Sequence, residues 1–431
     1  MEKKTILIKN GHVIDPANKI DGEMDVLIKE GKIAEVGNDI KEKAEQIVDA
    51  KGLLVTPGFV DIHVHLREPG REDKETIETG LRAALAGGVT SVVTMPNTTP
   101  ITDSQSMVEF QIKRARELDL ANLFPAGAIT KEEAGEELSH IWEMKNSGIV
   151  AISDDGTDVQ NEGLMKRSFE YGKTFNLVTI NHCEIKDLSE DGVMHEGKIS
   201  TRLGLPGIPS VAEELAVAKV LMLAEYVGTR VHISHVSTKR SVELIKEYQQ
   251  RGINVTADTC PHYISLTDEA CLDYNTYAKI YPPLRPQTDV DAVIDGIREG
   301  VISVIATDHA PHLAFEKLQS FKDAARGTVG LETSFAVAYT YLVKTKKLSL
   351  SKLIEAMTIR PANVVSIPKG TLSIGADADV TIIDINKNWT ADIEKMQTKG
   401  RNSVFNGMDL TGKVQQVFVG GVEKVRNEKL L

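Results

Sequence analysis

Cysteine is scarce in this sequence, and its few copies are not arranged for cross-linking or metal binding. Only three of the 431 residues are cysteine: Cys183, Cys260 and Cys271. Their number is odd and no C-x-x-C pair occurs. This argues against a disulfide framework and against a thiolate metal site. We therefore expect a protein of the reducing cytoplasm.

Long apolar runs and an excess of positive charge are also missing. No stretch approaches the roughly 20 apolar residues of a membrane-spanning helix. The short apolar run near the N-terminus is not that of a signal peptide. The net charge of −12 argues against nucleic acid or an anionic membrane as the main partner. We expect a small-molecule substrate, with no nucleic-acid or membrane partner.

Two common catalytic motifs are absent as well. The sequence contains neither a G-x-S-x-G turn nor a phosphate-binding loop of the form G-x-x-x-x-G-K-[ST]. A nucleophilic serine on such a turn and a nucleotide-binding loop are therefore excluded, and the chemistry must come from other side chains.

The middle of the chain alternates between short β-rich runs and segments with helical spacing of apolar residues. The helical segments include residues 75–88, 103–119 and 210–228. Eight β-then-α units predict a (β/α)8 barrel of the TIM type over residues 58–367. The predicted strands lie in residues 58–65, 89–97, 121–130, 148–155, 176–184, 230–237, 253–263 and 302–310.

Both ends of the chain have a different texture. Residues 1–57 and 368–431 contain β-branched runs that are broken by turn residues such as Asn-Gly and Glu-Gly. We expect the two ends to build one small β-sandwich domain beside the barrel.

Histidines and aspartates stand at the ends of several predicted strands, where barrels of this kind carry function. Each could be structural if taken alone, but a shared site explains the group more economically. The residues are His63, His65, His182, His235 and Asp308, together with one of the adjacent acids Asp154 and Asp155. The set offers imidazole and carboxylate ligands without thiolate, which suits zinc, although manganese or cobalt could replace it. We expect one or two ions, with two favoured, and metal-assisted hydrolysis or its reverse.

Side-chain alternation along each strand predicts which residues face the barrel interior. His63 and His65 share one face, which would place Ile62 and Val64 on the helix side. His235 is in phase with Val231 and Ile233.

His232 has the opposite parity from His235, so we interpret it as a packing or hydrogen-bonding residue. Alternation puts Asp154 and Asp155 on opposite faces but leaves open which of them is the ligand. The other acid would be a turn residue before Gly156.

These motifs are familiar as a set. With PGFVDIHVHLREPG, ISDDG, NHCE, HVST and TDHAPH, the chain resembles the amidohydrolase superfamily, and within it the class I (bacterial-type) dihydroorotases. The resemblance implies a barrel with a β-sandwich made from both termini. It also implies the interconversion of dihydroorotate and N-carbamoyl-L-aspartate in pyrimidine biosynthesis. We expect a homodimer.

The resemblance also implies a role for individual residues. His63 and His65 match the ligands of a first zinc, His182 and His235 those of a second, and Asp155 the residue that both metals share. Asp308 matches the catalytic residue that touches the metal and carries the proton. The residues expected on the substrate are Arg67, Asn97, Tyr281, His312 and Gly327. Arg67 can pair with a substrate carboxylate in fork geometry.

Two departures from the family pattern keep other substrates open. Tyr281 stands in KIYPPLR where the family has an asparagine, and the loop at Gly327 reads AARGTVG. TADTCPHY is also similar to hydantoinases and allantoinases. The alternatives are therefore a hydantoinase-, dihydropyrimidinase- or allantoinase-like hydrolase, for which Arg67 would have to accept a less acidic substrate, and an inactive scaffold barrel. An inactive relative would be expected to lack ligands, and none is missing here.

Overall fold

The centre of the molecule is an eight-stranded parallel sheet rolled into a nearly closed barrel. The computed structural model describes residues 4–431. Its barrel strands follow one another in chain order. They are β6 (Phe59–Val64), β7 (Val89–Thr94), β8 (Asn122–Ala128), β9 (Ala151–Ser153), β10 (Val178–Asn181), β13 (Val231–Ile233), β14 (Val255–Thr259) and β15 (Val304–Ile305). Each lies within a predicted run, so the eight predicted strands are confirmed.

The first and last barrel strands meet only at one end. Val64 and His309 form a parallel bridge just beyond β15, and the backbone N–H of His65 donates to the carbonyl of His309 over 2.9 Å. The barrel therefore closes at the carboxyl ends of its strands, which is where the candidate ligands lie.

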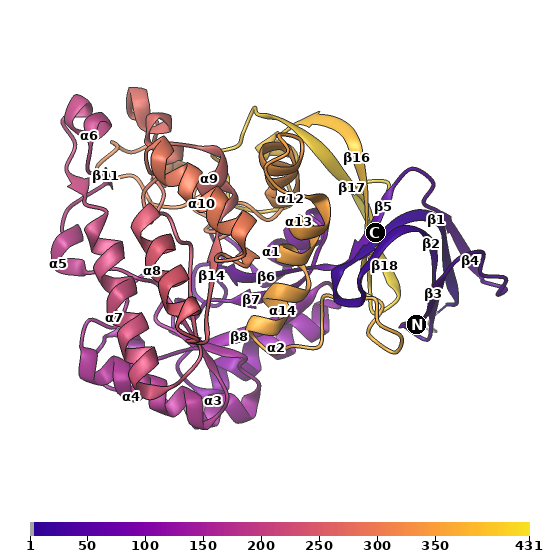
Figure 1. The fold of residues 1–431 in the computed structure, drawn as a ribbon, viewed down its shortest axis with the longest axis horizontal. Coiled ribbons are helices and arrows are strands. Elements are labelled where there is room, and N and C mark those ends of the chain that lie inside the picture. The colour runs from indigo at the N-terminus through magenta and orange to yellow at the C-terminus, as the bar shows by residue number, and fades with distance from the viewer. Residues whose placement is uncertain (1–3) are drawn as a thin grey trace.

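Helices follow the strands, and the longer ones cover the outside of the barrel (Figure 1). They are α1 (Ile77–Ala86), α2 (Gln105–Leu118), α3 (Ile141–Ser147), α4 (Glu162–Thr174), α5 (Lys186–Ser189), α6 (Lys198–Leu203), α7 (Val211–Val227), α8 (Lys239–Gln250), α9 (Pro261–Ser265), α10 (Gln287–Glu299), α11 (Ala314–Lys317), α12 (Ser334–Ala338), α13 (Leu350–Met357) and α14 (Ile359–Val364). The three helices predicted from apolar spacing correspond to α1, α2 and α7. Within residues 4–431, none of the helices has both the length and the apolar character needed to cross a bilayer.

The interior of the barrel is a packed core rather than a channel. Val178 and Ile180 of β10 pack in one buried cluster with Val304 of β15 and with Ala362 of α14. A second and larger cluster fills the space between the strands and the surrounding helices. This filling leaves the mouth at the carboxyl ends of the strands as the place for a site.

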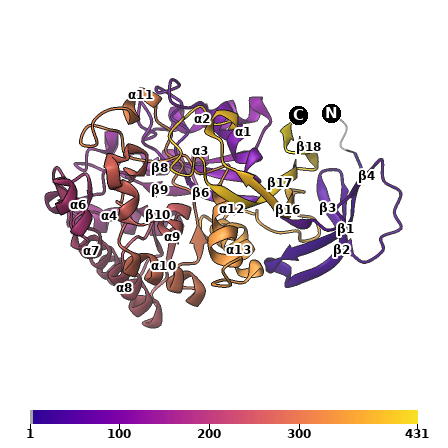
Figure 2. The same ribbon diagram turned by 90° about the horizontal axis from the view of Figure 1, so that it is seen from above.

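Strands from both ends of the chain share a nine-stranded sheet beside the barrel (Figure 1). They are β1 (Ile6–Asp15), β2 (Ile20–Lys29), β3 (Lys32–Gly37), β4 (Gln46–Asp49), β5 (Leu54–Pro57), β16 (Val380–Thr390), β17 (Asp409–Val419), β18 (Val422–Arg426) and β19 (Lys429–Leu430). Antiparallel pairing of β5 with β16 joins the two ends. Figure 2 shows β16 and β17 reaching from this sheet toward the barrel.

Candidate metal and substrate site

Two groups of potential metal ligands meet at the mouth of the barrel, and one carboxylate belongs to both. The first group is His63, His65 and Asp155, and the second is Asp155, His182 and His235. Within each group the ligand atoms lie within 4.8 Å of one another, and all five residues are buried. The structure therefore brings together the residues that the sequence indicated.

The distances place Asp155 between the two histidine pairs. Its Oδ1 lies 3.2 Å from Nε2 of His63, and its Oδ2 lies 3.5 Å from Nε2 of His65. On the other side, Oδ1 lies 3.8 Å from Nδ1 of His182 and 3.9 Å from Nε2 of His235. A carboxylate placed in this way can bind two cations with its two oxygens.

Several polar atoms of this cluster have no hydrogen-bond partner within residues 4–431. They include both ring nitrogens of His63, Oδ1 of Asp155 and Nε2 of His182. Buried polar atoms are nearly always satisfied, and a bound metal ion would satisfy these atoms. The donor set of imidazole nitrogens and carboxylate oxygens fits zinc.

The local electrostatics also favour a cation. Burial alone would raise the pKa of Asp155, but the charge of His63 and the nearby imidazoles of His235 and His65 lower it well below its usual value. Burial likewise opposes protonation of His63, yet the nearby Asp155 raises its pKa to about 10. Two buried carboxylates, Asp155 and Asp308, thus create a site that requires positive charge, which a metal can supply.

Asp308 completes the cluster at the end of β15. Its Oδ1 lies 3.1 Å from Nε2 of His65 and 3.6 Å from Nε2 of His63. Its backbone has the left-handed φ of 46°, which is uncommon outside glycine. The carboxylate therefore lies beside the first group of ligands, where it can contact both a metal and a reacting molecule.

Simple alternation is wrong for β6. Ile62 packs in the interior cluster with Val60, whereas Val64 packs in the helix-facing cluster. A register shift between Asp61 and Val64 interrupts the strand, so Ile62 and His63 both face inward. The extra residue lets β6 supply a core side chain and a ligand in succession.

Alternation also gives the wrong reason for His235. Val231 and Ile233 pack in the helix-facing cluster, so a regular strand would have directed His235 outward. Instead, β13 ends at Ile233 and His235 adopts a φ of 37°. This turn redirects its ring into the site.

Two buried aspartates that the sequence analysis did not single out hold these irregular strand ends. Oδ1 of Asp61 accepts from the backbone N–H groups of His63 (3.1 Å) and Thr307 (3.2 Å). Oδ1 of Asp258 accepts from the N–H of His235 over 2.6 Å, and its Oδ2 lies 2.8 Å from Nε2 of His232. His232 is thus a hydrogen-bonding residue, as predicted. The alternation of side chains along a strand does not indicate the role of either aspartate, because each accepts hydrogen bonds from backbone N–H groups.

The two adjacent acids after β9 have separate tasks. Asp155 joins the ligand cluster, whereas Oδ1 of Asp154 accepts from the backbone N–H groups of Ile129 (2.7 Å) and Thr130 (3.0 Å). The hydroxyl of Thr130 also donates to Asp154. Asp154 therefore fastens the loop after β8 and is not a simple turn residue.

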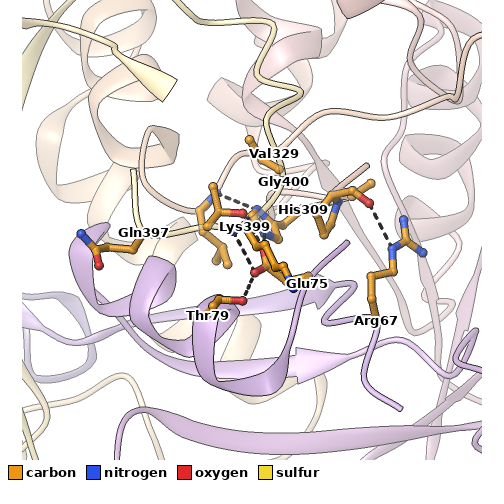
Figure 3. Close-up of polar contacts among 12 residues, drawn as sticks. Arg67, Glu75, Thr79, His309, Val329, Gln397, Lys399 and Gly400 are labelled. Carbon is orange, nitrogen blue, oxygen red and sulfur yellow. Dashed lines mark hydrogen bonds and ion pairs between the residues drawn. The ribbon is translucent and has the colours of Figure 1, made fainter. Parts of the chain in front are cut away.

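Arg67 and Asn97 lie beside the cluster. Arg67 has a φ of 59° and its Nε donates to the carbonyl of Pro311 over 3.4 Å (Figure 3). The pKa of its guanidinium is lowered by burial, which outweighs the opposite effect of the charges of Asp308 and Asp155. Oδ1 of Asn97 lies 2.8 Å from Nδ1 of His65. It therefore orients this ring so that Nε2 faces the carboxylates, in addition to any contact with substrate.

His312 approaches the same space from the loop after β15. The sequence analysis did not single out Lys74, whose Nζ lies 3.2 Å from Nδ1 of His312. Because an ammonium can only donate, Nε2 of His312 carries the hydrogen and can donate to a ligand. Burial and the positive charges of Arg67 and Lys74 lower the pKa of His312 to about 3, so the ring stays neutral.

Gly327 borders the ring of His312 and has a φ of 126°. A Cβ at this position would lie 2.8 Å from Cβ of Ala310 and 3.4 Å from Nε2 of His312. Any larger residue would therefore strain the loop and fill space beside the histidine.

Tyr281 contacts one of the candidate metal ligands, His182. Its ring stacks on that of His182, with centroids 5.6 Å apart and an interplanar angle of 24°. The guanidinium of Arg326 also lies over the Tyr281 ring, with its central carbon 4.3 Å from the ring centroid. The pair supports the second histidine group, and substrate contact by Tyr281 stays a prediction. Tyr281, His182 and Glu184 also line a small pocket.

Comparisons with known proteins agree with this geometry. Among solved structures, an L-hydantoinase (dihydropyrimidinase) from Arthrobacter aurescens superposes with a TM-score of 0.89 at 26% identity, over 99% of this chain and 97% of that one. A dihydropyrimidinase from Brevibacillus agri has a TM-score of 0.87 at 23% identity, over 99% and 96% of the two chains, and shows the shared fold. The class defined by fold and site is thus that of the cyclic-amide hydrolases of the amidohydrolase superfamily.

Sequence comparison narrows the class to one family. The model of dihydro-orotase-like proteins matches residues 52–241. The dihydroorotase of Acetivibrio thermocellus is 50% identical over 99% of this chain and 100% of its own length, and that of Syntrophus aciditrophicus is 46% identical over 96% and 98%. The chain belongs to the dihydroorotase family.

The different tasks of Asp154 and Asp155 give a matched test. Asp154→Ala should lower the free energy of unfolding by about 2–5 kcal/mol, because it leaves two buried N–H groups unsatisfied. Asp155→Ala should instead release most of the bound metal. Urea unfolding and elemental analysis of both variants measure the two effects, with the exposed Asp187→Ala as control. Equal metal loss in both variants would contradict the separation.

Proposed function

We propose that this protein is a zinc-dependent class I dihydroorotase that interconverts dihydroorotate and N-carbamoyl-L-aspartate in pyrimidine biosynthesis. The observation that carries the proposal is the position of Asp155, which two imidazole pairs share and whose charge, with that of Asp308, acts on the guanidinium of Arg67. A site that can activate water thus lies beside a side chain suited to an acidic substrate. The near-full-length identity with dihydroorotases supports this reaction over the hydantoinase alternative.

Two zinc ions would be held by the two groups that share Asp155. His63 and His65 would bind one, and His182 and His235 the other, with Asp308 in contact with the first. When bound, zinc supplies Lewis acidity that activates water and polarises a carbonyl oxygen. The chain's own contribution is to fix the ligand positions through Asp61, Asp258 and Asn97.

The substrate would be oriented by side chains beside the cluster. Arg67 can pair with the carboxylate next to the reacting amide, and His312 can donate from Nε2. The two side chains approach one space, since Arg67 contacts Pro311 and His312 follows that residue directly. Asn97, Tyr281 and Gly327 would border the ring.

Asp308 would carry the proton during the reaction. In hydrolysis, its carboxylate accepts a proton from the attacking water and passes it to the amide nitrogen as the carbon–nitrogen bond breaks. The nitrogen is a poor leaving group unless it is protonated. In the reverse direction the same carboxylate takes the proton from the attacking nitrogen, so both directions use one residue.

The domain arrangement that we propose follows the sequence analysis. Residues 58–367 form the catalytic barrel, and residues 1–57 with 368–431 form a β-sandwich domain. The shared sheet, in which β5 pairs with β16, supports this division. We also propose a cytoplasmic homodimer.

A substrate panel tests the proposed activity directly. Purified protein loaded with zinc should interconvert dihydroorotate and N-carbamoyl-L-aspartate much faster than it opens hydantoin, dihydrouracil or allantoin. Prolonged chelation should remove zinc and activity together, and added zinc should restore both. Preference for an uncharged ring would favour the hydantoinase alternative, and full activity without a transition metal would rule out the metal site.

Arg67→Lys tests the substrate anchor. The variant keeps the positive charge but loses the two-pronged geometry of the guanidinium. Charged hydrogen bonds contribute about 1.5–3 kcal/mol, so kcat/KM for dihydroorotate should fall roughly 10- to 150-fold. Arg71→Lys, at a half-exposed arginine four residues away, is the control. Wild-type kinetics in Arg67→Ala would remove this residue from the site.

Asp308→Asn tests the proton carrier. The amide keeps the size and one acceptor oxygen but cannot carry a proton. General acid–base catalysis contributes typically about 10²–10⁴ in rate, and both directions should lose a similar factor. Rates should be measured in both directions together with zinc content. Activity within a few-fold of wild type would contradict the role, and complete loss of zinc would show that Asp308 acts mainly as a ligand.

A further inference from the structure

A segment near the C-terminus, between η6 (Ile393–Lys395) and β17, lies against the loops that follow β6 and β15. We call residues 397–404 the C-terminal strap. It leaves the nine-stranded sheet, passes over the loops that carry Asp308, His312 and Gly327, and returns to the sheet. Figure 3 shows Lys399 and Gly400 of the strap close to Glu75 and His309, with the side chain of Gln397 directed away from them.

Asn402 is the centre of the strap and is completely buried, with 0% of its surface exposed. Its Nδ2 donates to the carbonyls of Ala310 (2.8 Å) and Gly327 (3.2 Å), and its Oδ1 accepts from the backbone N–H of His312 (2.8 Å). All three partners are backbone groups of fixed polarity, so the amide can take only this orientation. One side chain thus joins the two loops that border the substrate space.

Backbone contacts of the strap reinforce this junction. The carbonyl of Asn402 accepts from the N–H of Val329 over 3.2 Å, and the N–H of Val404 donates to Oγ1 of Thr328 over 2.9 Å. Gly400 packs so closely on Pro311 that a Cβ would lie 2.6 Å from the proline ring. The loop after β15 and the loop at Gly327 therefore contact the strap along most of its length.

A second junction lies beside Asp308. Nδ1 of His309 accepts from the N–H of Gly330 over 3.1 Å, so its Nε2 carries the hydrogen and faces Oε2 of Glu75 at 3.3 Å. The other oxygen of Glu75 accepts from the N–H of Lys399 over 3.0 Å (Figure 3). The residue next to Asp308 is therefore connected to the strap through one carboxylate.

We propose that Asn402 is a positioning residue for the substrate side of the site. By joining Ala310, His312 and Gly327 it sets the separation of the two loops, and thereby the place where the Nε2 hydrogen of His312 meets the substrate. The four histidine ligands and Asp155 lie at other strand ends, whereas Asp308 precedes the segment that Asn402 holds. Within residues 4–431, the side chain of Asn402 makes its hydrogen bonds to Ala310, His312 and Gly327 and to none of these ligands. Its loss should therefore weaken substrate binding more than metal binding or the chemical step. This inference rests on the proposed dihydroorotase activity.

Kinetics of Asn402→Ala in the zinc-loaded, full-length protein test the proposal. Three lost hydrogen bonds that leave backbone groups unpaired should raise KM for N-carbamoyl-L-aspartate about tenfold or more, while kcat changes less than about threefold. Zinc content should stay at the wild-type level. Asn402→Asp should be at least as severe, because it places an oxygen against two carbonyls. Gln397→Ala, at an exposed residue of the strap, is the matched control and should leave KM and kcat unchanged.

Hydrogen exchange of the wild-type protein provides a test that does not depend on a folded variant. Addition of N-carbamoyl-L-aspartate should slow exchange in peptides covering residues 308–313, 326–330 and 397–404 together, and not in residues 415–426. The proposal is overturned if the strap does not respond while residues 308–313 do. It is also overturned if Asn402→Ala matches Gln397→Ala, or loses activity only in proportion to zinc. A wild-type protein without activity on this substrate would instead refute the proposed function.

Discussion

The arrangement of the site depends on one buried charge, the carboxylate of Asp155. It is surrounded by four imidazoles at the mouth of a barrel whose interior is otherwise apolar. A buried carboxylate is costly unless a cation or hydrogen-bond donors compensate it. Here the adjacent Asp308 adds a second negative charge, and several ring nitrogens have no protein partner among the residues that the structure describes. The cluster therefore offers two neighbouring positions that could hold a cation.

Irregular backbone at the strand ends makes this cluster possible. Arg67, His235 and Asp308 all have positive φ, and such conformations cost of order 1–3 kcal/mol each in non-glycine residues. Hydrogen bonds with buried aspartates, with side chains such as Asn97 and with the C-terminal strap stabilise these segments. The barrel supplies rigid strand ends, and these hydrogen bonds fix the direction in which each ligand side chain points.

Much of this could be predicted from the sequence because strands in a barrel have a strong periodic signal. The eight strands and the three named helices lie where the sequence predicts them, and the candidate ligands come together at the mouth of the barrel. Alternation failed for Ile62, where a register shift adds an inward residue, and for His235, whose ring is redirected by one backbone angle. Neither deviation leaves a mark in the apolar pattern. The contacts of Asn402 and Glu75 could not be predicted either, because they join segments that are distant in the sequence. Glu75 and Lys399, for example, are more than 300 residues apart.

Membership of the dihydroorotase family and the geometry of the site lead to the same account, in which Asp155 is shared by two metal positions. Electron paramagnetic resonance of the protein reconstituted with cobalt tests this most directly. The account predicts two cobalt ions per chain with spin coupling between them, and loss of the coupling in Asp155→Ala. Two uncoupled ions, or a single ion that Asp155→Ala retains, would contradict it.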